Sequence, residues 1–153
     1  EEAFGYFFPA AVFSTATNLA ASWLVDKHTL KPFLIVMLSV ITLGAFGFLN
    51  LSEPWGFWLL AAGFGCGGGL WGVISNLAYI RFYGPLNLGA ISGLNTSLSV
   101  FASAIGPAAF SLGLDYFGSY AVAIQVCIGT LLCLLVAAVL LPQNEPAPNL
   151  ASQ

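Results

Sequence analysis

The sequence predicts an all-α protein that crosses a membrane five times, and its composition and hydropathy pattern lead to that prediction. Only 6% of the 153 residues are charged, whereas 59% are hydrophobic, and the mean hydropathy is +0.93. Soluble domains carry about 25% charged residues, which keep their surfaces wetted. The apolar residues fall into five runs, and a helix that spans a bilayer needs about 20 mostly apolar residues. We therefore expect a polytopic helical protein whose surroundings are a lipid bilayer.

Charged, proline and glycine residues separate the five predicted spans. The first loop, at 25–31, is polar, and a short turn at 52–55 contains an acidic residue and a proline. A Gly-Pro pair marks the loop at 83–88, and a Phe-Gly-Ser turn follows Asp115. Such residues end helices because they favour turns or cannot continue the hydrogen-bond ladder. The spans of the predicted transmembrane domain, 1–141, lie at about 4–24, 32–51, 56–82, 89–114 and 120–141.

Basic residues predict how the chain is oriented in the membrane. Lys27, Lys31 and Arg81 all lie in or beside the loops after the first and third spans, which are on the same side. The turns after the second and fourth spans contain acidic residues instead. Basic loops face the cytoplasm by the positive-inside rule. We therefore expect an integral protein of the plasma (inner) membrane with a cytoplasmic C-terminus, and residues 142–153 as a disordered cytoplasmic tail.

The composition excludes two function classes. Three Lys and Arg residues supply no clustered basic charge for binding nucleic acid. No charged side chain lies in the apolar part of a span, so no carboxylate pair, zinc site or proton relay is predicted there. Cys66, Cys127 and Cys133 lie in apolar runs without metal-ligand spacing and are expected to act as small hydrophobic side chains. We expect neither an enzyme nor a metal or cofactor site.

Polar residues divide the spans into two groups. On the first, third and fourth spans small and polar residues recur every third or fourth position, so that each helix has one polar stripe. The second and fifth spans carry only scattered polar residues and are expected to be outer, lipid-facing supports. An amide is costly to bury without partners. Asn18, Asn76 and Asn95, on three separate stripes, therefore favour a hydrated interior between these spans.

Close helix packing is the alternative explanation for the small residues. Small residues four positions apart let helices approach in lipid, where an interhelical hydrogen bond contributes only about 0.6 to 2 kcal/mol. We favour packing for Gly63, Gly67, Gly68 and Gly72. The glycine-rich run at 63–69 is not a phosphate-binding loop, because it lies at membrane depth and no GK[ST] sequence follows it, so we expect a bendable, tightly packed segment. The Gly106-Pro107 pair can be a functional hinge or a passive kink, because proline removes one backbone hydrogen bond.

Three stretches together resemble the major facilitator superfamily. The loop from Ser22 to Lys31, SWLVDKHTLK, resembles the second-half copy of that family's G-x-x-x-D-[RK] motif, with Ser22 in place of the usual glycine and Thr29 in place of the glycine of the turn. A second set of residues is similar to the family's path from its tenth through its eleventh helix. This set comprises Arg81 to Gly84, Gly89, Gly93, Gly106-Pro107, Gly113, Asp115 and Gly118 to Tyr120.

The resemblance implies helices eight to twelve of a twelve-helix bundle, an incomplete second half whose partner is a missing N-terminal half. It implies a secondary active transporter that moves a small solute by alternating access. A carboxylate near a helix N-terminus is stabilised by about 0.3 to 2 kcal/mol, and the resemblance sets Asp26 against the start of a helix in the absent half. The residues expected to control conformation are Asp26, Lys27, Gly106 and Pro107.

The predicted solute path combines the three polar stripes. Amides and hydroxyls would supply hydrogen bonds, and two aromatic side chains would supply walls. The alternative function is a non-transporting membrane scaffold or subunit, in which the small residues serve helix association only. The predicted path consists of Asn18, Trp71, Asn76, Tyr79, Asn95, Ser99 and Ser103.

Overall fold

The fold is all α, as predicted, and contains five helices long and apolar enough to cross a membrane. It was obtained as a computed structural model that describes residues 2–25 and 28–142. The five long helices are joined by short loops, and a single 3-10 turn, η1, precedes the fourth. The elements are α1 (Glu2–Val25), α2 (Leu30–Leu49), α3 (Pro54–Tyr83), η1 (Pro85–Asn87), α4 (Leu88–Phe117) and α5 (Ala121–Leu140).

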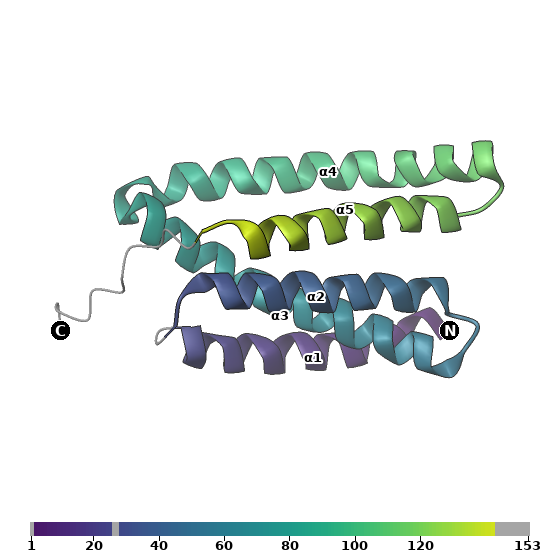
Figure 1. The fold of residues 1–153 in the computed structure, drawn as a ribbon, viewed down its shortest axis with the longest axis horizontal. Helices are drawn as coiled ribbons and strands as arrows, with labels where there is room; N and C mark the ends of the chain where they lie inside the picture. Colours follow the sequence, from purple (N-terminus) through teal and green to yellow (C-terminus); the bar gives the residue numbers. More distant parts are fainter. Residues whose placement is uncertain (1, 26–27, 143–153) are drawn as a thin grey trace.

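The helices lie side by side with alternating direction (Figure 1). The main contacts join α3 to α1 and to α2, and α2 also packs against α5. By contrast, α4 contacts α3 and α5 only sparsely, and α1 and α2 hardly touch each other. In the described chain α1, α2 and α3 therefore form a three-helix group built on α3. Helix α5 joins this group by packing against α2, and α4 is attached only loosely.

Glycines on two faces of α3 allow α1 and α2 to approach its backbone. A Cβ atom added at Gly63 would collide with the backbone of Gly44 on α2, and one added at Gly69 would collide with the carbonyl oxygen of Ser14 on α1. Gly67 lies equally close to α2, through Ile41. Residues 63 and 67 lie about 120° and 160° from residue 69 around a helix of 3.6 residues per turn. The packing explanation of the glycine-rich run is confirmed at these positions.

Apolar side chains fill the space between these helices near the loop that joins α1 to α2. Val25 is 1% exposed, and Met37, Leu70 and Ile74 are also buried. Lipid tails are as apolar as these side chains, so in a bilayer their contribution is van der Waals packing more than removal from water. The close approach that the glycines permit is what brings these side chains into contact.

The burial of α2 and α4 differs from the expectation that the second span is an outer support and the fourth an inner one. In the described chain α2 contributes six buried residues, whereas α4 contributes none. The physical reason lies in the glycines: Gly44 and Gly47 of α2 lie directly against α3, while Gly89 and Gly93 of α4 have nothing within 4 Å of an added Cβ. Helix α2 therefore packs inside the described group, and α4 lies at its edge.

Alanine at Gly63 should destabilise the fold, because its methyl group would overlap the Gly44 backbone and lie 2.6 Å from the Val40 carbonyl oxygen. Overpacking of this kind costs about 1 to 3 kcal/mol. We expect Gly63→Ala to lower the midpoint of thermal unfolding in detergent micelles, followed by circular dichroism. The matched control is Gly93→Ala, which adds the same methyl group in open space and should cause no loss. Equal midpoints for the two variants would contradict this account of α3.

Candidate functional site

The polar stripe of α4 is directed toward the rest of the bundle but is not covered by it. Ser92, Asn95 and Gly106 are half-buried and share one face of α4 with other half-buried residues near the two helix ends. Between these ends, every residue from 96 to 105 is exposed. The predicted path residues Ser99 and Ser103 are in this exposed middle. The centre of α4 therefore stands away from the other described helices.

Two hydroxyl groups of this stripe are satisfied within α4 itself. The Ser99 hydroxyl donates to the Asn95 carbonyl oxygen at 2.8 Å, and the Ser103 hydroxyl donates to the Ser99 carbonyl oxygen at 2.8 Å. Bonds of this type leave the hydroxyl oxygen free to accept a further hydrogen bond. The two serines can thus stay in an apolar environment at low cost and can also contact a polar molecule.

Asn95 differs from every other asparagine in the described part of the chain, because its side chain makes no hydrogen bond there. The others each donate to a carbonyl oxygen, at 2.8 to 3.3 Å. An amide carries two donors and an acceptor with two lone pairs. Leaving these groups without partners in an apolar medium costs roughly 2 to 7 kcal/mol, depending on the reference state. Asn95 is therefore the polar group on α4 that most needs a partner outside the described helices.

Asn18 lies on the contact between α1 and α3, and Asn76 lies one turn beyond Gly72 on α3. The Asn18 amide donates to the Gly69 carbonyl oxygen at 3.2 Å, which links the two helices. The Asn76 amide donates to the Gly72 carbonyl oxygen of its own helix at 2.8 Å. Gly72 lies beside Asn18, since a Cβ at Gly72 would be 3.2 Å from the Asn18 amide nitrogen. The structure thus gathers two predicted path residues along one stretch of α3, and Asn18 takes part in helix association.

The two predicted aromatic walls are on α3 but face different directions. Tyr79 is three residues from Asn76 and lies on the same face, where it is half-buried. Trp71 is 47% exposed and lies about 140° around the helix from Asn76. Within the described chain α1 and α4 make no contact. None of the seven predicted path residues lines any of four surface grooves between or along the described helices. A single solute path that joins the seven residues stays a prediction, and it requires further helices to enclose it.

The predicted conformational residues are only partly visible. Asp26 and Lys27 lie outside the described residues. Gly106 and Pro107 are inside α4, which continues through the proline to Phe117. No atom lies within 4 Å of an added Cβ at Gly106. Neighbouring helices therefore do not restrain the chain at this pair, and the choice between hinge and passive kink stays open.

Two basic side chains bind the C-terminal ends of other helices. The Arg81 guanidinium donates to the Val25 carbonyl oxygen at 2.9 Å and to the His28 carbonyl oxygen at 3.1 Å, at the end of α1. The Lys31 ammonium donates to the carbonyl oxygens of Val139 and Leu141, at the end of α5. Last-turn carbonyls lack intrahelical partners and carry partial negative charge, so a cation there is stabilising.

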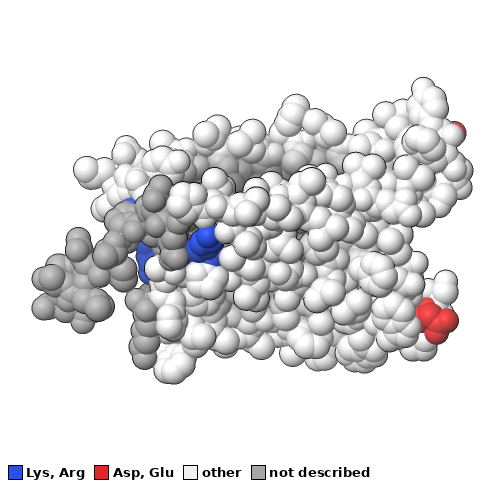
Figure 2. Space-filling view, in the orientation of Figure 1, with Lys and Arg blue, Asp and Glu red and all other residues white. Residues whose placement is uncertain are grey.

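These caps explain part of the charge asymmetry in Figure 2, where the basic side chains gather at one end and the acidic ones at the other. Sequence reasoning used Lys31 and Arg81 only as markers of orientation and missed this role. The available signal was their position next to predicted helix ends. Which helix each of the two side chains caps depends on tertiary packing, and the spacing of residues in the sequence does not predict that packing.

Comparisons with protein-family models, with curated proteins and with solved structures found no match for this chain. Any assignment of function therefore rests on the residues themselves. The most informative of them are the unsatisfied amide on α4 and the helix-end contacts on the basic side.

Replacing Arg81 by Gln should loosen the last turn of α1, because a neutral amide interacts less favourably with the helix dipole. A cation at a helix C-terminus contributes about 1 kcal/mol, which corresponds to roughly a fivefold change in an opening equilibrium. We expect amide hydrogen exchange at residues 22–25 to accelerate by about that factor. Lys31→Gln is the matched control and should accelerate exchange in the last turn of α5 instead. Unchanged exchange at 22–25 in Arg81→Gln would refute the capping role.

Proposed function

We propose that this chain forms part of a secondary active transporter of the major facilitator type, which moves a small solute across a membrane by alternating access. The observation that carries the proposal is Asn95, an amide without a hydrogen-bond partner in the described chain, on a helix without buried residues. The resemblance of the loop at 22–31 and of the stretch from 81 to 120 to that family supports the same proposal.

The position of Asn95 along α4 makes contact with lipid unfavourable. It lies seven residues beyond Leu88, or about 10 Å along the helix axis. The hydrocarbon core of a bilayer is about 30 Å thick, so this depth corresponds to the hydrocarbon region if α4 starts near its boundary. Polar groups inside membranes face a bundle interior or a water-filled cavity. The face of α4 that points away from Asn95 carries Val100 and Phe101 and suits contact with lipid.

A solute path along α4 needs walls that the described helices do not supply. In our proposal these walls come from helices outside the described residues, chiefly an N-terminal half. Ser99 and Ser103 continue the path beyond Asn95, because their hydroxyl oxygens keep accepting capacity. The end that carries Lys31 and Arg81 faces the cytoplasm by the positive-inside rule, in the plasma (inner) membrane, with the C-terminus on that side.

A membrane scaffold is the second candidate, and the Asn18 contact with Gly69 favours it. That hydrogen bond shows that an amide on a predicted polar stripe can serve helix association. In a scaffold Asn95 would bind a polar group of another helix, without water or solute beside it. The two candidates differ in whether a larger apolar side chain at residue 95 impairs movement of a solute.

Asn95→Leu should lower the rate of solute uptake by at least about tenfold, since loss of one transition-state hydrogen bond worth about 1.4 kcal/mol has that effect. The measurement is uptake into vesicles that contain the complete polypeptide, with a solute first identified by screening with and without an ion gradient. Ser97→Leu is the control, because Ser97 is exposed on the opposite face of α4. Wild-type uptake in Asn95→Leu would contradict the proposed path. Absence of any saturable uptake in the screen would favour the scaffold.

A further inference from the structure

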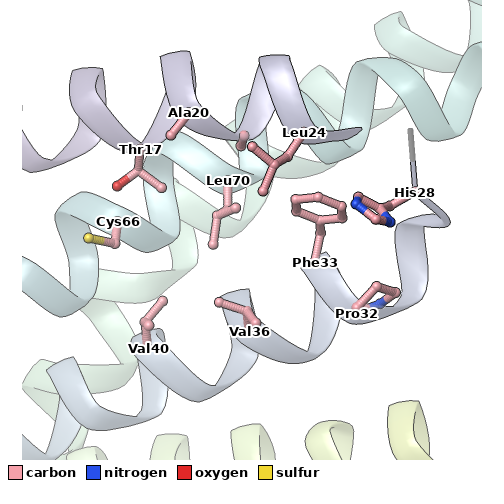
Figure 3. A pocket seen from close by; sticks show the side chains of 11 residues that line it. Thr17, Ala20, Leu24, His28, Pro32, Phe33, Val36, Val40, Cys66 and Leu70 are labelled. Carbon is pink, nitrogen blue, oxygen red and sulfur yellow. The ribbon is translucent and has the colours of Figure 1, made fainter. Parts of the chain in front are cut away.

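An apolar groove runs between α1 and α2 with α3 as its floor (Figure 3). It exists because α1 and α2 both pack on α3 and hardly touch each other. Its volume is about 570 Å³. Ala20 and Leu24 of α1 face Val36 and Val40 of α2 across it, and Leu70 of α3 lies at its base. The groove is open at the surface of the described helices and is lined by none of the predicted solute-path residues.

The length of the groove matches one leaflet of a bilayer. Along α2 it extends from Pro32 to Val40, eight residues or about 12 Å. Half of a hydrocarbon core of about 30 Å is about 15 Å. The groove begins at the basic end of the molecule and stops near the middle of the helices, beside Cys66. It therefore has the depth that a lipid chain of the leaflet on that side occupies.

The lining of the groove suits a hydrocarbon chain. Apart from Thr17 and His28 the lining is apolar, so it offers almost no hydrogen bonds to a peptide backbone or a polar solute. An acyl chain needs no such partners.

Charge at the open end of the groove favours an anionic headgroup. The His28 side chain lies at this end (Figure 3), and Lys31 and Arg81 lie at the same end of the described chain. Among the residues whose side chains the structure describes, the acidic ones lie on the opposite side (Figure 2). They are Glu53, in the loop between α2 and α3, and Asp115, near the end of α4. Basic groups at the membrane surface attract anionic lipids by about 1 kcal/mol for each Lys or Arg.

We propose that the groove between α1 and α2 binds one acyl chain of an anionic phospholipid, with the lipid phosphate beside His28. A lipid chain that enters the groove exchanges contacts with other lipid chains for contacts with apolar side chains. The chain therefore supplies little selectivity among lipids. The headgroup supplies the preference, because the phosphate meets the positively charged end of the protein and can accept a hydrogen bond from the imidazole. This lipid site is separate from the path along α4 and does not depend on transport.

The proposal is tested by counting lipids that stay bound to the protein. The protein is reconstituted into vesicles of equal parts phosphatidylglycerol and phosphatidylcholine, extracted with mild detergent and analysed by native mass spectrometry. We expect wild-type protein to retain phosphatidylglycerol over phosphatidylcholine by about fivefold, the factor that corresponds to roughly 1 kcal/mol. Ala20→Trp fills the groove and should abolish retention. Ala11→Trp is the control, since Ala11 is exposed on the other side of α1.

A second variant separates the headgroup from the chain. His28→Ala leaves the apolar lining intact, so it should retain lipid but show a weaker preference for phosphatidylglycerol, with the remaining preference supplied by Lys31 and Arg81. This outcome can be measured even if Ala20→Trp does not fold. Equal retention of the two lipids by wild-type protein would overturn the proposal, as would an unchanged preference in His28→Ala. A dimer that replaces bound lipid and disappears in Ala20→Trp would identify a second copy as the occupant and would also overturn it.

Discussion

Close backbone contact between α3 and its two neighbours is the constraint on which the rest of this structure depends. In lipid the helices gain no hydrophobic stabilisation from association, so their attraction comes from van der Waals contact at short range. Gly63 and Gly67 admit α2, and Gly69 admits α1. Because both neighbours approach the same helix from different sides, they do not close on each other. The apolar groove between α1 and α2 follows directly from this geometry.

The fourth helix has the opposite character, and the proposed function depends on that contrast. Gly89, Gly93 and Gly106 have open space around them, the middle of the helix is exposed, and Asn95 has no hydrogen-bond partner in the described chain. A helix of this kind gains little packing stabilisation from its described neighbours. It instead presents polar groups to whatever lies beside it in the membrane. The three-helix group built on α3 thus supplies a rigid body, and α4 supplies the surface on which a solute or a partner helix would act.

The sequence was sufficient to predict the five helices, because a spanning helix needs a long apolar run, and loops with charged residues or a Gly-Pro pair interrupt such runs. The fourth helix, expected at 89–114, extends through Phe117 because Gly118 ends it in the left-handed conformation. Tertiary partners could not be predicted from spacing. Neither the Asn18 contact with Gly69 nor the capping of α1 by Arg81 follows from periodicity. A polar stripe has the same spacing whether it binds a helix or faces water.

The central claim, that the polar face of α4 lines an aqueous path, is tested most directly by thiol labelling of two serines. The native Cys66, Cys127 and Cys133 are first replaced by Ala, and Ser99→Cys and Ser97→Cys are then compared in sealed vesicles with a membrane-impermeant maleimide. Both serines are exposed and bond their own helix, but they lie about 160° apart around α4. The account predicts rapid labelling at residue 99 and little at residue 97. Equal or absent labelling at both would contradict it.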